Sequence, residues 1–162
     1  MNKNDLEQQF IAMIRKNERI IYKVCSFYTS DNLLIEDLYQ EAVCNLWAGY
    51  PKFRKESLES TWIYRITLNT CISGIRKDKR TPKGTPISIL QEAIAEPENM
   101  GEQITEMYNM IHQLKTLERA IVLLWLEDKS YQEISDITGL TICNVATKLK
   151  RSKEKLKQMS NR

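Results

Sequence analysis

The sequence is poor in the residues that build metal sites, disulfide frameworks and low-complexity chains. Among its 162 residues are one histidine, five glycines, four prolines and four cysteines, and no C-x-x-C pair occurs. The cysteines are Cys25, Cys44, Cys71 and Cys143. Spacings this wide suit neither a zinc site nor a disulfide framework. We therefore expect no metal and no cofactor, and we interpret the cysteines as small buried or half-buried thiols.

Long hydrophobic runs are absent as well. The longest one, Ala120 to Leu126, is far shorter than the roughly 18–20 residues that cross a bilayer. The chain begins MNKNDLEQQF, which carries charge and glutamine where a secretory signal would be apolar. We predict a cytoplasmic protein without direct membrane insertion.

The common catalytic motifs are missing too. The sequence contains no P-loop, no G-x-G-x-x-G and no HExxH. Its one histidine, His112, is more often a surface or core residue in this setting than a catalytic one. We therefore expect a protein that is not an enzyme.

The small net charge of +3 conceals a pattern along the chain. Residues 1–80 hold 13 basic and 10 acidic side chains, residues 81–110 hold 1 and 5, and residues 111–162 hold 10 and 6. The basic excess concentrates further in residues 76–80 and 148–162. Two such clusters are the electrostatic footprint of a polyanion partner, although a solvated helix face is the commoner cause of any single charge run.

Apolar residues recur at helical spacing almost throughout, and no segment alternates convincingly as a strand does. Residues 80–101 contain three of the four prolines and two of the five glycines, which favours a linker. We predict an all-α protein with two small helical domains, residues 1–80 and 105–162, joined by a flexible linker over 81–104.

The first domain is expected to contain four helices, the third of which has an acidic side. The expected ranges are 4–16, 18–29, 33–49 and 60–78. Asp31 or Asn32 can cap the third helix. Its apolar stripe leaves a polar side that comprises Glu36, Asp37, Gln40 and Glu41.

The fourth helix has a basic, hydrogen-bonding stripe. Arg65, Asn69 and Arg76 fall on one polar face, with Trp62 and Tyr64 nearby. Such a stripe can follow a nucleic-acid strand, because guanidinium groups bind phosphates and rings stack on unpaired bases. The alternative interpretation is that Trp62 belongs to the core.

The second domain contains a helix-turn-helix pattern. Ser130 and Glu133 form a capping box, Gly139 suits a tight turn, and Thr141 caps the following helix. That helix leaves Asn144, Thr147, Lys148 and Arg151 exposed. Residues 111–124 supply one supporting helix upstream. The pattern also fits an ordinary αα-hairpin, but short polar and basic side chains at the start of the second helix are typical of major-groove readers.

Taken together, the two halves resemble a known family. Glu36-Asp-Leu-Tyr-Gln-Glu41, Ser60-Thr-Trp-Ile-Tyr-Arg-Ile66, Ser130-Tyr-Gln-Glu-Ile134 and Gly139-Leu-Thr141 are similar, in this order, to segments of bacterial RNA polymerase sigma factors of the extracytoplasmic-function (ECF) group. The resemblance covers about residues 8–80 and 105–158. It implies a sigma factor that directs core polymerase to promoters and assists promoter melting.

The resemblance also implies three sets of contact residues. The clamp helices of the largest polymerase subunit would contact Glu36, Asp37, Leu38, Gln40, Glu41 and Trp47. The minus-ten promoter element would contact Trp62, Tyr64, Arg65, Asn69, Arg76 and Lys77. The minus-thirty-five element would contact Thr141, Asn144, Thr147, Lys148, Lys150 and Arg151. The flap of the second-largest subunit is a further expected partner, and many family members bind an anti-sigma factor.

The sequence departs from the family pattern at several positions. Ala146 replaces a frequent basic residue, Lys150 replaces a frequent histidine, and Lys55 to Glu59 lacks a usual Gly-Asp pair. These changes leave the promoter sequence open. A stand-alone helix-turn-helix regulator is the alternative function, but it gives no role to the acidic side of residues 33–49.

Overall fold

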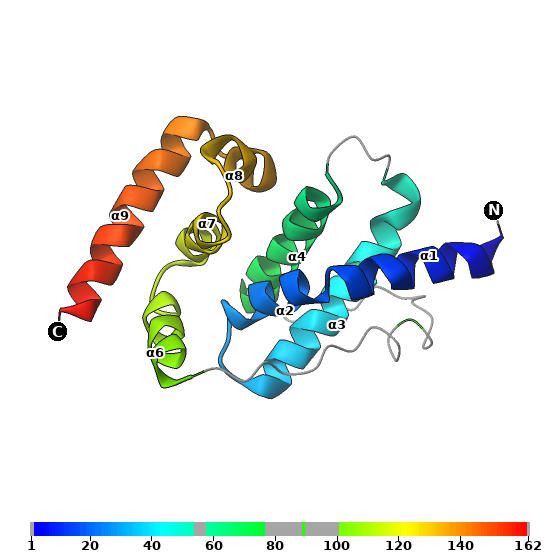
Figure 1. The fold of residues 1–162 in the computed structure, drawn as a ribbon, viewed down its shortest axis with the longest axis horizontal. Helices are drawn as coiled ribbons and strands as arrows, with labels where there is room; N and C mark the ends of the chain where they lie inside the picture. The colour runs from blue at the N-terminus through cyan, green and yellow to red at the C-terminus, as the bar shows by residue number, and fades with distance from the viewer. Residues whose placement is uncertain (1, 54–57, 77–88, 90–100, 162) are drawn as a thin grey trace.

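The chain forms an all-α fold in a computed structural model that describes residues 2–53, 58–76, 89 and 101–161. The helices of the first half are α1 (Lys3–Lys16), α2 (Glu18–Ser26), α3 (Asn32–Gly49), the short 3₁₀ helix η1 (Tyr50–Lys52) and α4 (Glu59–Arg76). Those of the second half are α6 (Glu102–Ile111), α7 (Thr116–Leu126), α8 (Tyr131–Thr138) and α9 (Ile142–Ser160). Figure 1 shows the two halves as neighbouring groups of helices.

Side-chain caps define the starts of the first helices. The Asn2 side chain accepts a hydrogen bond of 2.8 Å from the Asp5 amide at the start of α1. Asp31 caps α3 by accepting one of 2.9 Å from the Leu33 amide, as its sequence predicts. The predicted second helix is shorter than expected: α2 ends at Ser26, and the amides of Phe27 and Tyr28 close the last turn.

The first half buries the apolar stripes of its helices in one core. Phe10 and Ile14 from α1, Ile21 from α2, Leu46 from α3 and Ile63 from α4 have essentially no exposed surface. Helices α2 and α3 both pack against α4. This core fixes α3 and α4, which pack against each other, in their relative positions.

The second half contains the predicted helix-turn-helix. Ser130 and Glu133 exchange the two hydrogen bonds of a capping box, at 3.0 and 3.1 Å, which fixes the start of α8. Helix α8 ends at Gly139, which has a φ of 79°. Thr141 then caps α9 by accepting from the Asn144 amide at 3.2 Å. These three predictions from local sequence are confirmed.

The structure differs from three other sequence expectations. Residues 111–124 do not form one helix, because a turn at His112–Lys115 separates α6 from α7. Cys143 is exposed, unlike the other three cysteines, because it follows the Thr141 cap on the outward face of α9. Residues 102–104, expected in the linker, form the first turn of α6.

The two halves pack against each other through α2 and α4 on one side and α6, α7 and α8 on the other (Figure 1). The Tyr28 hydroxyl donates to the Thr116 carbonyl at 2.8 Å, and the His112 Nε2 lies 2.8 Å from the Ser26 carbonyl oxygen. The Lys23 ammonium forms an ion pair of 2.5 Å with Glu127. Within the described residues, no helix has the length and apolar character needed to span a membrane.

Candidate nucleic-acid interface

The basic stripe predicted on α4 is divided between exposed and covered residues. Asn69 is exposed, as is Ser73 one turn further along the helix. Arg65 is half-buried, and its guanidinium donates a hydrogen bond of 2.9 Å to the Asp136 carbonyl of α8. Arg76 is the last residue of α4; its side chain, like Lys77, lies outside the described residues. Among the described side chains of the predicted basic stripe, Asn69 is thus the one that is accessible to solvent.

The aromatic residues of α4 lie in the core. Trp62 is 9% exposed and stacks on Phe53, with ring centroids 4.5 Å apart and planes inclined by 10°. Tyr64 is 3% exposed and lies against the second half of the chain. The Lys129 ammonium is 5.4 Å from its ring centroid. Burial, followed by the nearby Glu127 carboxylate, raises the pKa of Tyr64.

The six residues of α3 that are predicted to contact the polymerase also differ in burial. Glu36, Asp37 and Gln40 are exposed and form an acidic, polar face. Leu38 is only 4% exposed and belongs to the core. The others are half-buried: Trp47 packs edge-on against Phe10 at a centroid distance of 5.1 Å, and Glu41 faces α4.

Helix α9 presents most of its predicted DNA-contacting residues to solvent. Asn144, Thr147, Lys150 and Arg151 are exposed, and Lys148 is half-buried. Thr141 is exposed too, although its hydroxyl oxygen caps the helix. On the opposite side Val145 and Leu149 are buried, which anchors α9 to the core. The arrangement is that of a helix-turn-helix reader, in which the second helix offers its N-terminal half to a groove.

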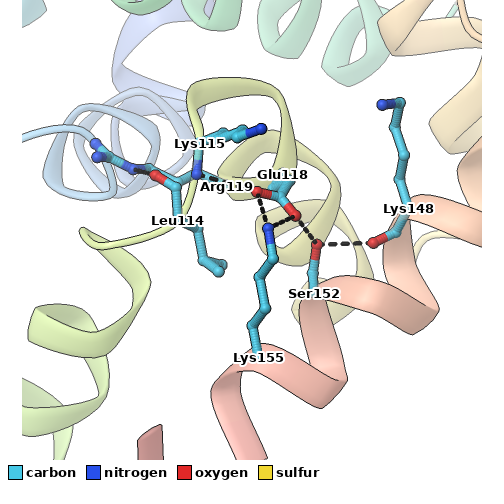
Figure 2. A network of polar contacts seen from close by, with 7 residues as sticks. All are labelled: Leu114, Lys115, Glu118, Arg119, Lys148, Ser152 and Lys155. Atoms are coloured by element: carbon cyan, nitrogen blue, oxygen red, sulfur yellow. Dashed lines mark hydrogen bonds and ion pairs between the residues drawn. The ribbon is translucent and has the colours of Figure 1, made fainter. Parts of the chain in front are cut away.

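Two basic residues in the second half of α9 contact other side chains of the protein. The Lys155 ammonium contacts both carboxylate oxygens of Glu118 on α7, at 2.9 and 3.0 Å (Figure 2). The Lys153 ammonium lies 4.2 Å from the ring centroid of Trp125. Both lysines belong to the basic cluster of residues 148–162, which the sequence indicates as part of a polyanion footprint. Their partners are more than 25 residues away along the chain, so local spacing carried no signal for these contacts.

Glu118 is the centre of the polar network in Figure 2. Its Oε1 also accepts from the Lys115 amide at 3.2 Å, and its Oε2 lies 3.4 Å from the Ser152 hydroxyl. That hydroxyl has one proton, which the closer Lys148 carbonyl receives at 2.7 Å. Burial opposes ionisation of Glu118, but the hydrogen bonds from Lys155 and Lys115 outweigh it and lower the pKa of the carboxyl group. The network ties α9 to α7.

Arg119, the next residue, joins the two halves at the turn between α6 and α7. Its guanidinium donates to the Leu114 carbonyl at 2.8 Å and also to the His112 carbonyl. A further contact of 3.5 Å reaches the Tyr28 carbonyl in the first half. Its cationic group also lies 5.7 Å from the Tyr28 ring centroid. Arg119 thus stabilises the turn at His112–Lys115, where the sequence predicts a continuous helix.

Family models match both halves of the chain. Residues 13–81 match sigma-70 region 2, and residues 104–156 match sigma-70 region 4. The chain is 24% identical to the ECF RNA polymerase sigma-E factor of Escherichia coli K12, over 95% of this chain and 87% of that protein. It is 26% identical to that of Haemophilus influenzae, over 91% of this chain and 85% of that protein.

Solved structures with a similar fold include a sigma factor. The sigma factor RpoE of Bartonella quintana, in complex with the anti-sigma factor NepR, superposes with a TM-score of 0.70 at 17% identity, covering 97% of both chains. CnrH, in complex with the cytosolic domain of CnrY, gives a TM-score of 0.64 at 14% identity, covering 96% of this chain and 95% of that one. At these identities the likeness concerns the fold alone.

The order of the two matched regions, the all-α fold and the capped reader helix agree with one another. The chain belongs to the ECF group of the sigma-70 family. It is accordingly a transcription initiation factor that directs RNA polymerase to promoters, with core polymerase and promoter DNA as its partners.

Proposed function

We propose that three surfaces of the chain divide the work of initiation. The exposed acidic face of α3, formed by Glu36, Asp37 and Gln40, binds the clamp helices of the largest polymerase subunit. The polar face of α4 and the basic residues after it bind and open the minus-ten element. Helix α9 docks on the minus-thirty-five element. The observation that carries this assignment is the exposure, on one chain, of an acidic face on α3 and a basic reader face on α9.

The proposal also covers the domain boundaries, the cellular location and the catalytic role of the chain. We assign polymerase and minus-ten binding to residues 1–80, the connection to 81–101 and minus-thirty-five binding to residues 102–162, which begin with α6. The chain acts in the cytoplasm, where core polymerase and promoter DNA are found. It contributes no catalytic group of its own, since polymerase performs nucleotide transfer. The polymerase flap is a further contact of the second domain.

An anti-sigma factor is a further candidate partner. One similar solved structure contains a sigma factor, RpoE of Bartonella quintana, bound to the anti-sigma factor NepR. An inhibitor that covers both helical domains would compete with polymerase. Titration of such a protein from the same genome into a polymerase-binding assay tests this: competition supports it, and simultaneous binding of both proteins contradicts it.

Polymerase binding by α3 can be tested with substitutions on its exposed face. Glu36→Ala combined with Asp37→Ala removes two exposed carboxylates without touching the core. We expect affinity for core polymerase to fall about tenfold or more, because several charge-assisted contacts are lost. Equilibrium binding of labelled full-length chain to core polymerase measures the change.

The control for this test is Glu106→Ala, which removes an equally exposed carboxylate from α6. It should bind polymerase as wild type does. Equal affinity of the α3 double variant and wild type would contradict the assignment of α3. A stand-alone regulator would bind duplex operators without polymerase, and no described residue favours that function over the sigma factor.

A further inference from the structure

Two thiols are in contact inside the first half of the chain. Cys25 lies on α2 and Cys71 on α4, and neither has any exposed surface. The Cys71 thiol donates a hydrogen bond to the Cys25 Sγ, and the two sulfur atoms are 3.9 Å apart. Because the two residues are 46 positions apart in the sequence, the packing of α2 against α4 brings them together. The wide spacing of the cysteines in the sequence gives no sign of this contact.

The geometry of the pair is close to that of a disulfide. In a disulfide the two sulfur atoms are about 2.05 Å apart, so those of Cys25 and Cys71 must approach each other by about 2 Å. Rotation about the Cα–Cβ bond moves each sulfur atom while the backbone stays in place. Since α2 and α4 already pack against each other, a bond between the two sulfur atoms can form within the packed arrangement of the helices.

The other two cysteines differ from this pair. Among the described residues, Cys25 and Cys71 are the only cysteines that are hydrogen-bonded to each other. Cys44 on α3 is also buried, with 1% of its surface exposed, and is therefore a matched control. Cys143 on α9 is exposed, so it is the cysteine through which two copies of the chain can be linked.

The second half of the chain covers the helix that carries Cys25. Lys23, Ser26 and Tyr28, on α2 and just after it, are all bonded to residues of the second half. Burial, followed by the nearby Cys71 thiol, raises the pKa of Tyr28. A buried thiol is shielded from oxidants, so oxidation takes place during local openings of α2. Such openings become more frequent when the second half no longer holds α2 in place.

Hydrogen peroxide can convert two adjacent thiols to a disulfide in two steps. One sulfur, as its thiolate, attacks an oxygen atom of hydrogen peroxide; the O–O bond breaks, and a sulfenic acid and a water are formed. The second thiol attacks the sulfenic sulfur; the S–S bond forms, and a second water leaves. In total, two thiols and one hydrogen peroxide give one disulfide and two waters. The two sulfur atoms are oxidised, and the two peroxide oxygens are reduced.

We propose that Cys25 and Cys71 form a redox-sensitive pair, in which hydrogen peroxide joins α2 to α4 through a disulfide and the second half of the chain limits the rate by covering α2. The disulfide fixes α4 to α2, and α4 carries the exposed Asn69 two positions before Cys71. Oxidation thus acts on the helix to which we assign minus-ten binding. The reaction itself does not depend on that assignment, and it is tested without polymerase or DNA.

The experiment follows disulfide formation in full-length proteins. The reference protein carries Cys143→Ser, which prevents links between copies of the chain. Three variants of it add Cys25→Ser, Cys44→Ser or Glu127→Lys. Each reduced protein is treated with hydrogen peroxide, samples are taken over time, and the remaining thiols are alkylated. Mass spectrometry of peptides that are digested without reductant identifies and quantifies the linked pair, and thermal unfolding checks that each reduced protein is folded.

We expect the reference protein to form a disulfide between Cys25 and Cys71 that dithiothreitol reduces again. Cys44→Ser should form it at the same rate, and Cys25→Ser should lose it. Glu127→Lys opposes the ammonium of Lys23 with a second positive charge and weakens the packing of the halves, so it should form the disulfide about twofold to fivefold faster.

Other outcomes overturn different statements. Absence of the linked peptides in the peroxide-treated reference protein, or oxidation of both thiols to sulfinic acids without a link, would overturn the redox-sensitive pair. Loss of the link in Cys44→Ser would overturn the choice of Cys25 and Cys71 as the partners. Equal rates in Glu127→Lys and the reference protein would overturn the statement that the second half limits the reaction. Failure of the chain to bind polymerase would overturn the proposed function, and this is measured separately.

Discussion

Among the single residues, Glu118 shows how one buried carboxylate links distant parts of the second half. It lies on α7, is 8% exposed, and accepts hydrogen bonds from the Lys115 amide and the Lys155 ammonium. Its lowered pKa means that the folded state binds a proton less readily than the unfolded chain does. The resulting stability is present above the ordinary carboxyl pKa of 4.5 and is lost as the pH falls through the lower, folded value.

Replacing Glu118 should therefore reduce stability in a pH-dependent way. We expect Glu118→Gln to lower the free energy of unfolding by about 1–2 kcal/mol at neutral pH, because charged hydrogen bonds are lost. The difference from wild type should shrink well below pH 4.5, once the pH has passed the lower pKa of the folded wild-type carboxyl group and that group is itself protonated. Urea unfolding at both pH values measures this. The exposed control Glu106→Gln should have little effect, and a difference that is constant with pH would contradict the account.

At the scale of the element, the α8–α9 turn depends on a backbone conformation that few residues adopt. Gly139 has a φ of 79°, and a Cβ added there would meet no atom within 4 Å. The cost of a side chain at this position is thus backbone strain alone, and not a clash. The turn sets the direction of α9 relative to the core, and the docking on DNA that we propose for α9 depends on that direction.

The turn gives a graded prediction. Gly139→Ala should destabilise the protein by about 1 kcal/mol, and Gly139→Asn by less, because asparagine tolerates the left-handed conformation better. Thermal unfolding of the three proteins measures the order. Equal stability of the alanine and asparagine variants would show that backbone strain does not decide the effect.

The exposed face of α9 gives a second prediction at this scale. Lys150→Glu and Arg151→Glu reverse two exposed charges that we assign to the minus-thirty-five element. Each should weaken promoter binding by the holoenzyme and reduce the salt dependence of binding by about one unit of slope. Lys3→Glu, at the exposed start of α1, is the matched control. Unchanged salt dependence in the α9 variants would contradict their assignment to phosphate contacts.

For the whole molecule, the packing of the two halves controls access to the face of α4. Tyr64 is buried against the second half, and Arg65 donates to a carbonyl of α8 at 2.9 Å. The ion pair between Lys23 and Glu127 adds a further contact between the halves. Use of Tyr64 and Arg65 at the minus-ten element therefore requires the halves to separate.

The ion pair between the halves can be reversed to test this coupling. Glu127→Lys places like charges opposite each other and should weaken the packing by about 1 kcal/mol, since the pair is partly exposed. We expect a larger radius of gyration in small-angle scattering of the free protein. Adding Lys23→Glu should restore part of the packing. An unchanged radius in the single variant would contradict this role of the ion pair.

Sequence alone predicted the parts of the structure that depend on neighbouring residues. The caps at Asp31, Ser130 and Thr141 and the turn at Gly139 involve atoms within a few positions, so their spacing is informative. The helices within residues 102–126 were harder to predict from the sequence, because their apolar spacing continues across the turn at His112–Lys115.

The residues of the candidate site likewise fall into those that the sequence predicted correctly and those that it did not. Exposure of residues such as Asn144 and Glu36 followed from helical periodicity. Burial of Tyr64, the contact of Arg65 with α8 and the pairing of Lys155 with Glu118 arise between segments far apart in sequence. Such contacts depend on how helices pack, which local patterns do not encode.

The most direct test of the account is run-off transcription with core RNA polymerase, with and without the full-length chain, on a pool of genomic promoter fragments. The account predicts new transcripts that depend on the chain, whose start sites share two upstream sequence motifs separated by a fixed spacing. Absence of chain-dependent transcripts, together with absence of binding to core polymerase, would contradict it.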